Sequence, residues 1–233
     1  MINGIRGVYF DAGGTLLHPH PSVGEIYALV LRRWGVELPA EELQSSFRSS
    51  WRHLTHTPKD FTSEETEKEW WRKLVRMTLE SRAMPADFDG YFEDLYVSFA
   101  SPDYWRLHEG SLDCIRALRR AGLKTGIISN WDHRLRSILA GTPLCELMDD
   151  VIISSEVGCE KPDPRIFEEG VRRWGLKPSE LLYVGDSVHH DMEPCRKLGW
   201  STVLVHVHEQ VPPGIHVAGS FADVARLLGL RES

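Results

Sequence analysis

The chain has 233 residues, enough for one or two domains with a buried core. Its formal net charge is −7 and it contains no block of basic residues, which argues against a nucleic-acid partner and against an anionic membrane surface. No apolar run approaches the roughly 20 residues of a membrane helix, and the first residues lack the pattern of a signal peptide. The four cysteines form no CxxC motif and predict reduced thiols, so we expect a cytoplasmic protein.

Five short segments rich in apolar and β-branched residues predict strands, at residues 5–10, 125–129, 151–154, 181–184 and 202–207. They are apolar nearly throughout, which is typical of parallel strands covered on both faces. Helical segments lie between and after the later strands, and each ends at a glycine, a common helix stop. These helices are expected at residues 111–120, 134–139, 164–174, 191–198 and 221–228. The alternation predicts a doubly wound α/β fold with a parallel, Rossmann-like sheet.

One stretch interrupts this alternation. Residues 22 to about 100 carry no strand pattern and predict helices at residues 23–34, 40–53, 63–82 and 87–99. The aromatic residues of this stretch are expected to form its core. We therefore expect an all-helical domain of residues 18–101, inserted into an α/β domain that comprises residues 1–17 and 102–233.

Polar residues follow four of the predicted strands at their carboxyl ends, which is where ligands bind in an open parallel sheet. In chain order these residues are Asp11 to Leu16, Ser129 with Asn130, Glu160 to Pro164, and Gly185-Asp186-Ser187 with Asp191. Two carboxylates at one sheet edge can hold a hard cation such as Mg²⁺, which offsets repulsion between an anionic nucleophile and an anionic substrate. The sequence therefore predicts phosphate chemistry at this edge.

The order of these motifs resembles that of the haloacid dehalogenase-like hydrolase superfamily, and the helical insertion resembles the small helical cap of that family. Within it, the segments that begin at Ser129-Asn130-Trp131 and at Lys161-Pro162 are similar to a branch named for the fly "rhythmically expressed gene" product. The match spans residues 4–210, which is nearly the whole chain. The resemblance implies a Mg²⁺-dependent phosphatase that acts on a small phosphorylated metabolite.

The resemblance also implies a metal site. Asp11 would be both the covalent nucleophile and a metal ligand, because an aspartate can attack phosphorus and form an aspartyl-phosphate. Gly13 would offer its backbone carbonyl to the metal. Asp186 would be a further ligand, and Asp191 would act in or just outside the metal shell.

The remaining motif residues would bind the phosphoryl group. Ser129 and Asn130 would hydrogen-bond it, and Lys161 would steady Asp11 and neutralise the transferring charge. Thr15 would support the loop. Gly14 has no side chain, so its backbone N–H can approach a phosphate closely.

One position departs from the family pattern. Phosphatases of this family usually carry an aspartate two residues after the nucleophile, where it protonates the leaving oxygen and then activates water. This chain has Gly13 there. General acid–base help contributes on the order of 100- to 10,000-fold, so the departure bears directly on the reaction.

Several readings of this departure are open. The substrates can have good leaving groups, such as acyl or aryl phosphates. A histidine can replace the missing acid, the candidates being His18, His20, His133, His189 and His190. The reaction can differ, as in the 2-haloacid dehalogenases and the phosphonate-cleaving branch. The chain can also be a silent fold that binds a phosphorylated ligand or a protein partner. The sequence allows a monomer or a homodimer.

Overall fold

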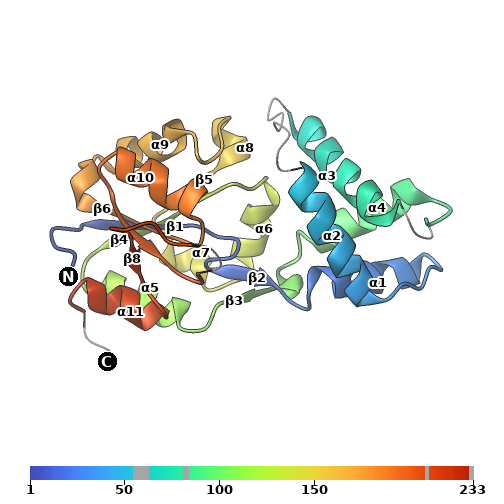
Figure 1. The fold of residues 1–233 in the computed structure, drawn as a ribbon, viewed down its shortest axis with the longest axis horizontal. Helices are drawn as coiled ribbons and strands as arrows, with labels where there is room; N and C mark the ends of the chain where they lie inside the picture. Colours follow the sequence, from blue (N-terminus) through green and yellow to red (C-terminus); the bar gives the residue numbers. More distant parts are fainter. Residues whose placement is uncertain (55–62, 81–83, 208–209, 231–233) are drawn as a thin grey trace. The chain divides into compact units, whose positions relative to one another are not determined.

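The computed structural model describes residues 1–54, 63–80, 84–207 and 210–230. The chain divides into two compact units, of which one comprises Met1–His18 with Leu107–Ser233 and the other comprises Pro19–Arg106. The first unit contains a sheet with helices and the second is built from helices (Figure 1). Within the described residues, no helix is long and apolar enough to cross a membrane.

The α/β unit is organised around one parallel sheet of six strands in the order β5-β4-β1-β6-β7-β8. The strands are β1 (Gly7–Phe10), β4 (Lys124–Ser129), β5 (Asp150–Ile153), β6 (Leu181–Gly185), β7 (Ser201–Leu204) and β8 (His216–Val217). The five predicted strands and the doubly wound α/β class are confirmed. The two-residue strand β8 was not predicted, because it is too short to carry a pattern of its own.

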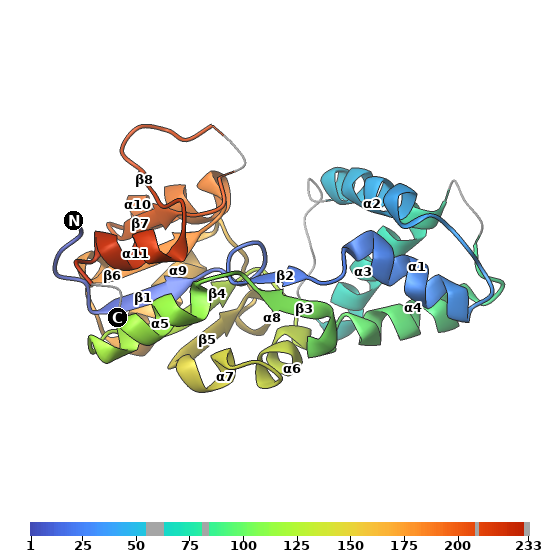
Figure 2. The same ribbon diagram turned by 90° about the horizontal axis from the view of Figure 1, so that it is seen from below.

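Helices cover both faces of this sheet (Figure 1). On one face lie α5 (Ser111–Arg120) and α11 (Phe221–Leu227), which are side by side in Figure 2. On the other face lie α9 (Pro164–Trp174) and α10 (Glu193–Lys197). The helix predicted at 191–198 is instead a π-helical turn, Val188–Met192, followed by α10.

Further short elements complete the α/β unit and its links to the helical unit. The helix α6 (Arg134–Ala140) matches the sequence prediction, whereas α7 (Leu144–Leu147) and α8 (Ser154–Val157) are single turns that were not predicted. A two-stranded sheet of β2 (Leu17–Pro19) and β3 (Trp105–Leu107) was also not predicted. Each of these elements is too short for periodicity to reveal it.

The central strand β1 is buried along its whole length, and its packing depends on small residues around one aromatic pair. The ring of Tyr9 stacks on Trp174 with centroids 3.8 Å apart. Added Cβ atoms would lie 2.4 Å from the Trp174 ring at Gly7, and 3.0 Å from the Tyr9 ring at Gly170. At Gly126 a Cβ would lie 2.6 Å from the Tyr9 ring. Glycine at these positions lets the aromatic pair reach the sheet.

The helical unit contains α1 (Val23–Arg33), α2 (Ala40–Leu54), α3 (Glu64–Leu79) and α4 (Phe88–Ser98). The helix α1 packs against α2 and α4, and α2 packs against α3. The core of the unit includes buried side chains of Tyr91, Phe92 and Tyr96, as expected for its aromatic residues. The last residues of the helix predicted at 63–82 lie outside the described residues.

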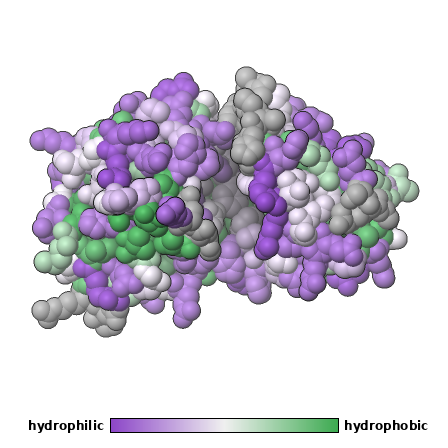
Figure 3. All heavy atoms as spheres, in the orientation of Figure 1, coloured by the Kyte–Doolittle hydropathy of each residue, from purple (hydrophilic) through white to green (hydrophobic). Residues whose placement is uncertain are grey.

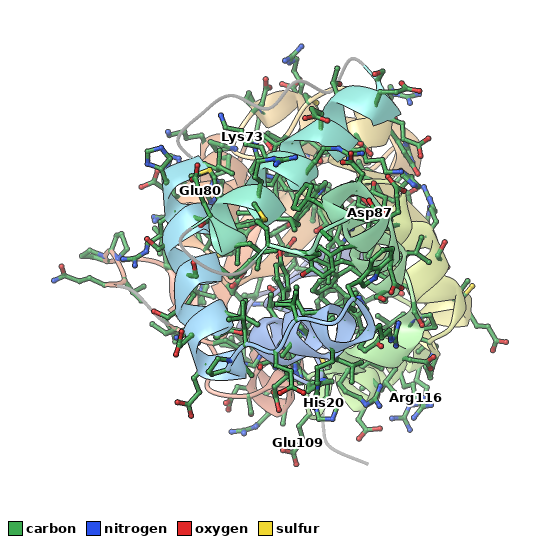
Figure 4. All side chains as sticks on the ribbon, turned by 90° about the vertical axis from the view of Figure 1, so that its right-hand side faces the viewer. His20, Lys73, Glu80, Asp87, Glu109 and Arg116 are labelled. Carbon is green, nitrogen blue, oxygen red and sulfur yellow. The ribbon has the colours of Figure 1, made fainter. Side chains whose placement is uncertain are left out.

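Polar residues cap these helices and cover their outer surface. The Ser22 side chain accepts the Glu25 N–H at the start of α1, and the Asp87 side chain accepts the Gly90 N–H at the start of α4. Figure 4 labels Asp87 together with Lys73 and Glu80, two exposed residues at α3 and its end. The exposed surface of this unit is largely hydrophilic in Figure 3.

The α/β unit, by contrast, shows an apolar area in the region of β8 (Figure 3). Val217 of this strand is 48% exposed, and Val207 is 41% exposed. β8 forms the edge of the sheet and is only two residues long. A short edge strand offers few unpaired backbone groups to another chain.

We expect Gly126→Ala to lower the free energy of unfolding by about 1–3 kcal/mol, because overpacking strains a filled core. The new methyl group would lie 2.6 Å from the Tyr9 ring and 2.9 Å from the Asp150 carbonyl oxygen. The control is Gly219→Ala, where the nearest atom lies 3.4 Å from the added carbon. Chemical denaturation measures both variants, and equal stabilities would contradict the packing argument.

Candidate active site

The sheet brings the polar residues that follow β1, β4 and β6 to one edge. Phe10 of β1 is in register with Ile127 of β4 and with Val184 of β6. Asp11 follows Phe10, and its N–H donates to the Val184 carbonyl at 2.9 Å. Ser129 is the last residue of β4, and Asp186 directly follows β6. The strand order therefore places these side chains together although they are far apart in the sequence.

The Asp11 carboxylate is buried and held by two donors, one from the end of β4 and one from the loop that carries Lys161. Ser129 Oγ donates to Asp11 Oδ1 at 2.9 Å, and Lys161 Nζ donates to the same oxygen at 2.8 Å. The donors fix the orientation of the carboxylate through one oxygen. The sequence predicted that these three residues act together, and the structure places them in direct contact.

Lys161 is the cation at the centre of the site. Its Nζ donates to Asp11 at 2.8 Å, to Asp191 at 2.6 Å and to the Tyr183 hydroxyl at 3.0 Å, so all three N–H groups have acceptors. Burial alone would lower the pKa of Lys161, but the attraction and hydrogen bonds of the two carboxylates outweigh it and raise the pKa. Lys161 is therefore a permanent positive charge near neutral pH.

Tyr183 is a site residue that the sequence analysis did not single out. Its hydroxyl donates to the Ile128 carbonyl at 2.6 Å and accepts from Lys161. Burial, then the nearby carboxylates of Asp191 and Asp11, raise the pKa of Tyr183 well above its usual value. The available signal was a tyrosine inside an otherwise apolar strand, since a buried hydroxyl needs a hydrogen-bond partner.

The Asn130 side chain holds the Lys161 loop. Its Nδ2 donates to the Lys161 carbonyl at 2.9 Å, and its Oδ1 accepts the Lys161 N–H at 2.6 Å. This pair of hydrogen bonds satisfies the amide as a backbone would. The side chain of Asn130 is therefore engaged in positioning Lys161, and its backbone is the part left for the phosphate contact that the sequence suggested.

Three carboxylates converge beside Lys161. Oxygen atoms of Asp11, Asp186 and Asp191 all lie within 4.8 Å of one another. Burial and then the charges of Asp11 and Asp191 raise the pKa of Asp186 to about 7. Burial likewise raises the pKa of Asp191, whose Oδ2 accepts the Ser187 N–H at 3.1 Å. An all-oxygen set with more negative than positive charge fits a hard divalent cation.

The loop after Asp11 is built so that Asp186 can approach it. Gly14 has a φ of +84°, and a Cβ there would lie 2.5 Å from Asp186 Oδ2. Thr15 Oγ1 donates to Asp186 Oδ1 at 3.4 Å. The Gly14 N–H donates to the Leu17 carbonyl at 2.9 Å, so this N–H is engaged within the loop. The phosphate contact suggested for Gly14 stays a prediction.

Gly13 lies against the indole of Trp131. A Cβ at Gly13 would be 3.0 Å from Trp131 Cζ3. The backbone of Trp131 is held by Ser154, whose Oγ accepts the Trp131 N–H and donates to the Trp131 carbonyl, both at 3.0 Å. The space beside Gly13 is therefore filled by an aromatic ring.

Three of the histidines proposed as substitute acids, His18, His189 and His190, have side-chain contacts that the structure defines. The His18 ring lies 4.7 Å from that of His108, and His190 Nδ1 lies 3.2 Å from Ser187 Oγ. His189 Nδ1 is 3.8 Å from Glu193. Across the part of the chain that the structure describes, the donors to the Asp11 carboxylate are Ser129 and Lys161.

Proteins of known family resemble this chain over most of its length. Haloacid dehalogenase-like hydrolase domain-containing protein 3 of Mus musculus is 31% identical and aligns with 98% of this chain and 96% of its own. The rhythmically expressed gene 2 protein of Drosophila melanogaster is 33% identical, with 86% of this chain and 83% of its own aligned. Glyceraldehyde 3-phosphate phosphatase of Methanopyrus kandleri is 26% identical, over 86% and 84% respectively. The predicted branch of the superfamily is confirmed.

Solved structures share the fold. A haloacid dehalogenase-like (HAD) phosphatase from Thermococcus onnurineus has a TM-score of 0.68 at 21% identity. The alignment includes 98% of this chain and 100% of the phosphatase chain. An L-2-haloacid dehalogenase from Xanthobacter autotrophicus has a TM-score of 0.72 at 20% identity, over 96% and 98%. The sequence profile of haloacid dehalogenase-like hydrolases matches residues 5–199. This chain is an enzyme of the haloacid dehalogenase-like hydrolase family.

Proposed function

We propose that this hydrolase is a Mg²⁺-dependent phosphatase that acts on a small phosphorylated metabolite through an aspartyl-phosphate on Asp11. The observation that carries the proposal is a buried cluster in which Lys161 bridges Asp11 and Asp191. A carboxylate oxygen of Asp186 lies within 4.8 Å of oxygens of both aspartates. The phosphatase relative from Methanopyrus kandleri supports a phosphate ester as the substrate.

The residues present fit a magnesium ion. Asp11, Asp186 and the Gly13 carbonyl would hold it, with Asp191 at or just outside the metal shell. The ion would offset the repulsion between Asp11 and an anionic phosphoryl group. The pKa of Asp186 is raised by burial and by the negative charges of Asp11 and Asp191. A bound cation would offset this negative charge.

The chemistry of the protein residues follows from their contacts. Asp11, oriented by Ser129 and Lys161, forms a bond to phosphorus while the bond from phosphorus to the leaving oxygen breaks. The leaving oxygen takes the electron pair. Water then attacks phosphorus and the Asp11–phosphorus bond breaks, which releases inorganic phosphate and restores the carboxylate. Lys161 stays protonated and neutralises negative charge throughout.

The helical region would take part in substrate selection. Residues 18–101 would act as a cap, because they are inserted into the α/β region directly after the loop that carries Asp11. Loops held on a rigid scaffold commonly determine which substrate an enzyme accepts. A cytoplasmic monomer or homodimer remains our expectation.

We expect Asp11→Asn to lower the Mg²⁺-dependent hydrolysis of acetyl phosphate and p-nitrophenyl phosphate by roughly a thousandfold or more, since it removes the nucleophile. Release of inorganic phosphate and of p-nitrophenol measures the two rates, with EDTA as the metal-free condition. The control is Asp113→Asn, at a carboxylate whose side chain is 87% exposed in the ion pair with Arg116.

Other outcomes would separate the alternatives. Metal-independent release of halide from 2-haloacids, without phosphate release, would identify a dehalogenase. Binding of inorganic phosphate without turnover of either substrate would identify a silent fold. Equal rates for the wild type and Asp11→Asn would show that Asp11 is not the nucleophile.

We expect Mg²⁺ to raise the melting temperature of the protein, because a cation bound only by the folded state stabilises it. At ten times its Kd the ion adds about 1.4 kcal/mol to the free energy of unfolding. Asp186→Asn removes one of the three carboxylates and should abolish most of the shift. NaCl at matched ionic strength is the control, and an equal shift in Asp186→Asn would show that Mg²⁺ binds elsewhere.

We expect Lys161→Met to lower the free energy of unfolding by about 3–5 kcal/mol, since it leaves Asp11 and Asp191 buried without their counter-ion. Lys177→Met, at an exposed lysine, is the matched control and should stay close to the wild type. Equilibrium denaturation without metal measures the difference. If both variants are equally stable, Lys161 does not hold the strand ends together.

A further inference from the structure

Trp131 occupies the space into which a side chain at position 13 would project. A Cβ on Gly13 would lie 3.0 Å from Cζ3 of the indole and 3.7 Å from Cε3 and Cη2. A 3.0 Å carbon–carbon separation is well inside the usual 3.5–4.0 Å contact, and a carboxyl group would need more room still. A side chain at position 13 therefore requires the ring at position 131 to shift.

The segment that carries Trp131 is fixed on both sides. Before it, the Asn130 side chain is tied to the Lys161 backbone. After it, Asp132 and Arg134 form a buried ion pair, with Arg134 Nε donating to Asp132 Oδ1 at 2.8 Å. Ser154 holds both backbone groups of Trp131 itself. The backbone cannot yield easily, so the indole would have to rotate about its own side-chain bonds.

The resemblance to the family implies that position 13 lies where a phosphatase carries the acid for the leaving oxygen, and the ring of Trp131 lies beside that position. Gly13 is two residues from Asp11, and the indole edge lies against Gly13. The Lys161 ammonium donates to two carboxylates and a hydroxyl, so its protons are already engaged. A leaving oxygen at this place would meet an aromatic surface where a general acid would otherwise act.

Given the proposed phosphatase function, we infer that Trp131 is the specificity-determining residue and selects phosphates with planar, weakly basic leaving groups. The bond from Asp11 to phosphorus forms as the bond to the leaving oxygen breaks. An aryl oxide or a carboxylate accepts that electron pair as a stable anion and is protonated later by water. A planar group also packs on the partly buried indole, which an alkyl alcohol does less well.

The test is a double-mutant cycle of Gly13→Asp and Trp131→Ala, assayed with p-nitrophenyl phosphate and glycerol 2-phosphate in Mg²⁺. We expect Gly13→Asp alone to gain little on glycerol 2-phosphate, because the ring blocks the new carboxyl. The double variant should gain on the order of 100-fold over either single variant, the lower range of acid–base assistance. Trp131→Ala alone should raise KM for p-nitrophenyl phosphate, and Trp131→Phe, which keeps an aromatic surface, should restore it.

Melting temperatures give a second readout that does not depend on turnover. Gly13→Asp should melt below the wild type. The decrease in melting temperature of the double variant should be smaller than the sum of the decreases in the two single variants. Additive melting temperatures, or a full gain on glycerol 2-phosphate in Gly13→Asp alone, would overturn the inference.

The wild-type rates separate this inference from the proposed function. Equal kcat/KM for both substrates in the wild type would keep the phosphatase proposal and overturn the role of Trp131. No phosphate release from either substrate by any variant would overturn the phosphatase and the leaving-group assignment together. The steric conflict between positions 13 and 131 would then still be decided by the melting temperatures.

Discussion

The burial of one ammonium group between carboxylates organises the candidate active site. The Lys161 side chain is 4% exposed, and its Nζ donates hydrogen bonds to Asp11, Asp191 and Tyr183. A buried charge is tolerated only when it is paired and hydrogen-bonded, so the loops that supply these partners must close around it. The loop after β1, the strand β6 and the turn after it are thereby joined at one point. Asn130 adds the second constraint, because its amide fixes the backbone from which Lys161 extends.

That arrangement leaves an excess of negative charge where a phosphate ester would have to bind. Three carboxylates meet a single ammonium, and the pKa of both Asp186 and Asp191 is raised mainly by burial. An anionic substrate would be repelled unless another positive charge enters. The carboxylate oxygens and the proposed reaction both fit a hard divalent cation with oxygen ligands.

Gly13 and Trp131 together show how a shared scaffold can support a narrower reaction. A missing acid, taken alone, leaves open whether another group has replaced it. The indole that fills the adjoining space bears on this point, because a carboxylate at position 13 would require the ring to shift. The same glycine that would limit proton transfer leaves room for an aromatic surface, and the leaving group then has to be one that needs no proton from the enzyme.

The sequence alone determined the features that depend on neighbouring residues. Continuous apolar runs identified the strands buried on both faces, glycines marked helix ends, and the polar residues after successive strands located the edge at which they meet. Only the tertiary structure decided which of these residues touch. The hydroxyl of Tyr183 on Lys161, the amide of Asn130 on the Lys161 backbone and the ring of Trp131 on Gly13 join residues far apart in the chain. Such contacts follow from strand order, loop path and side-chain orientation, and local patterns carry none of these.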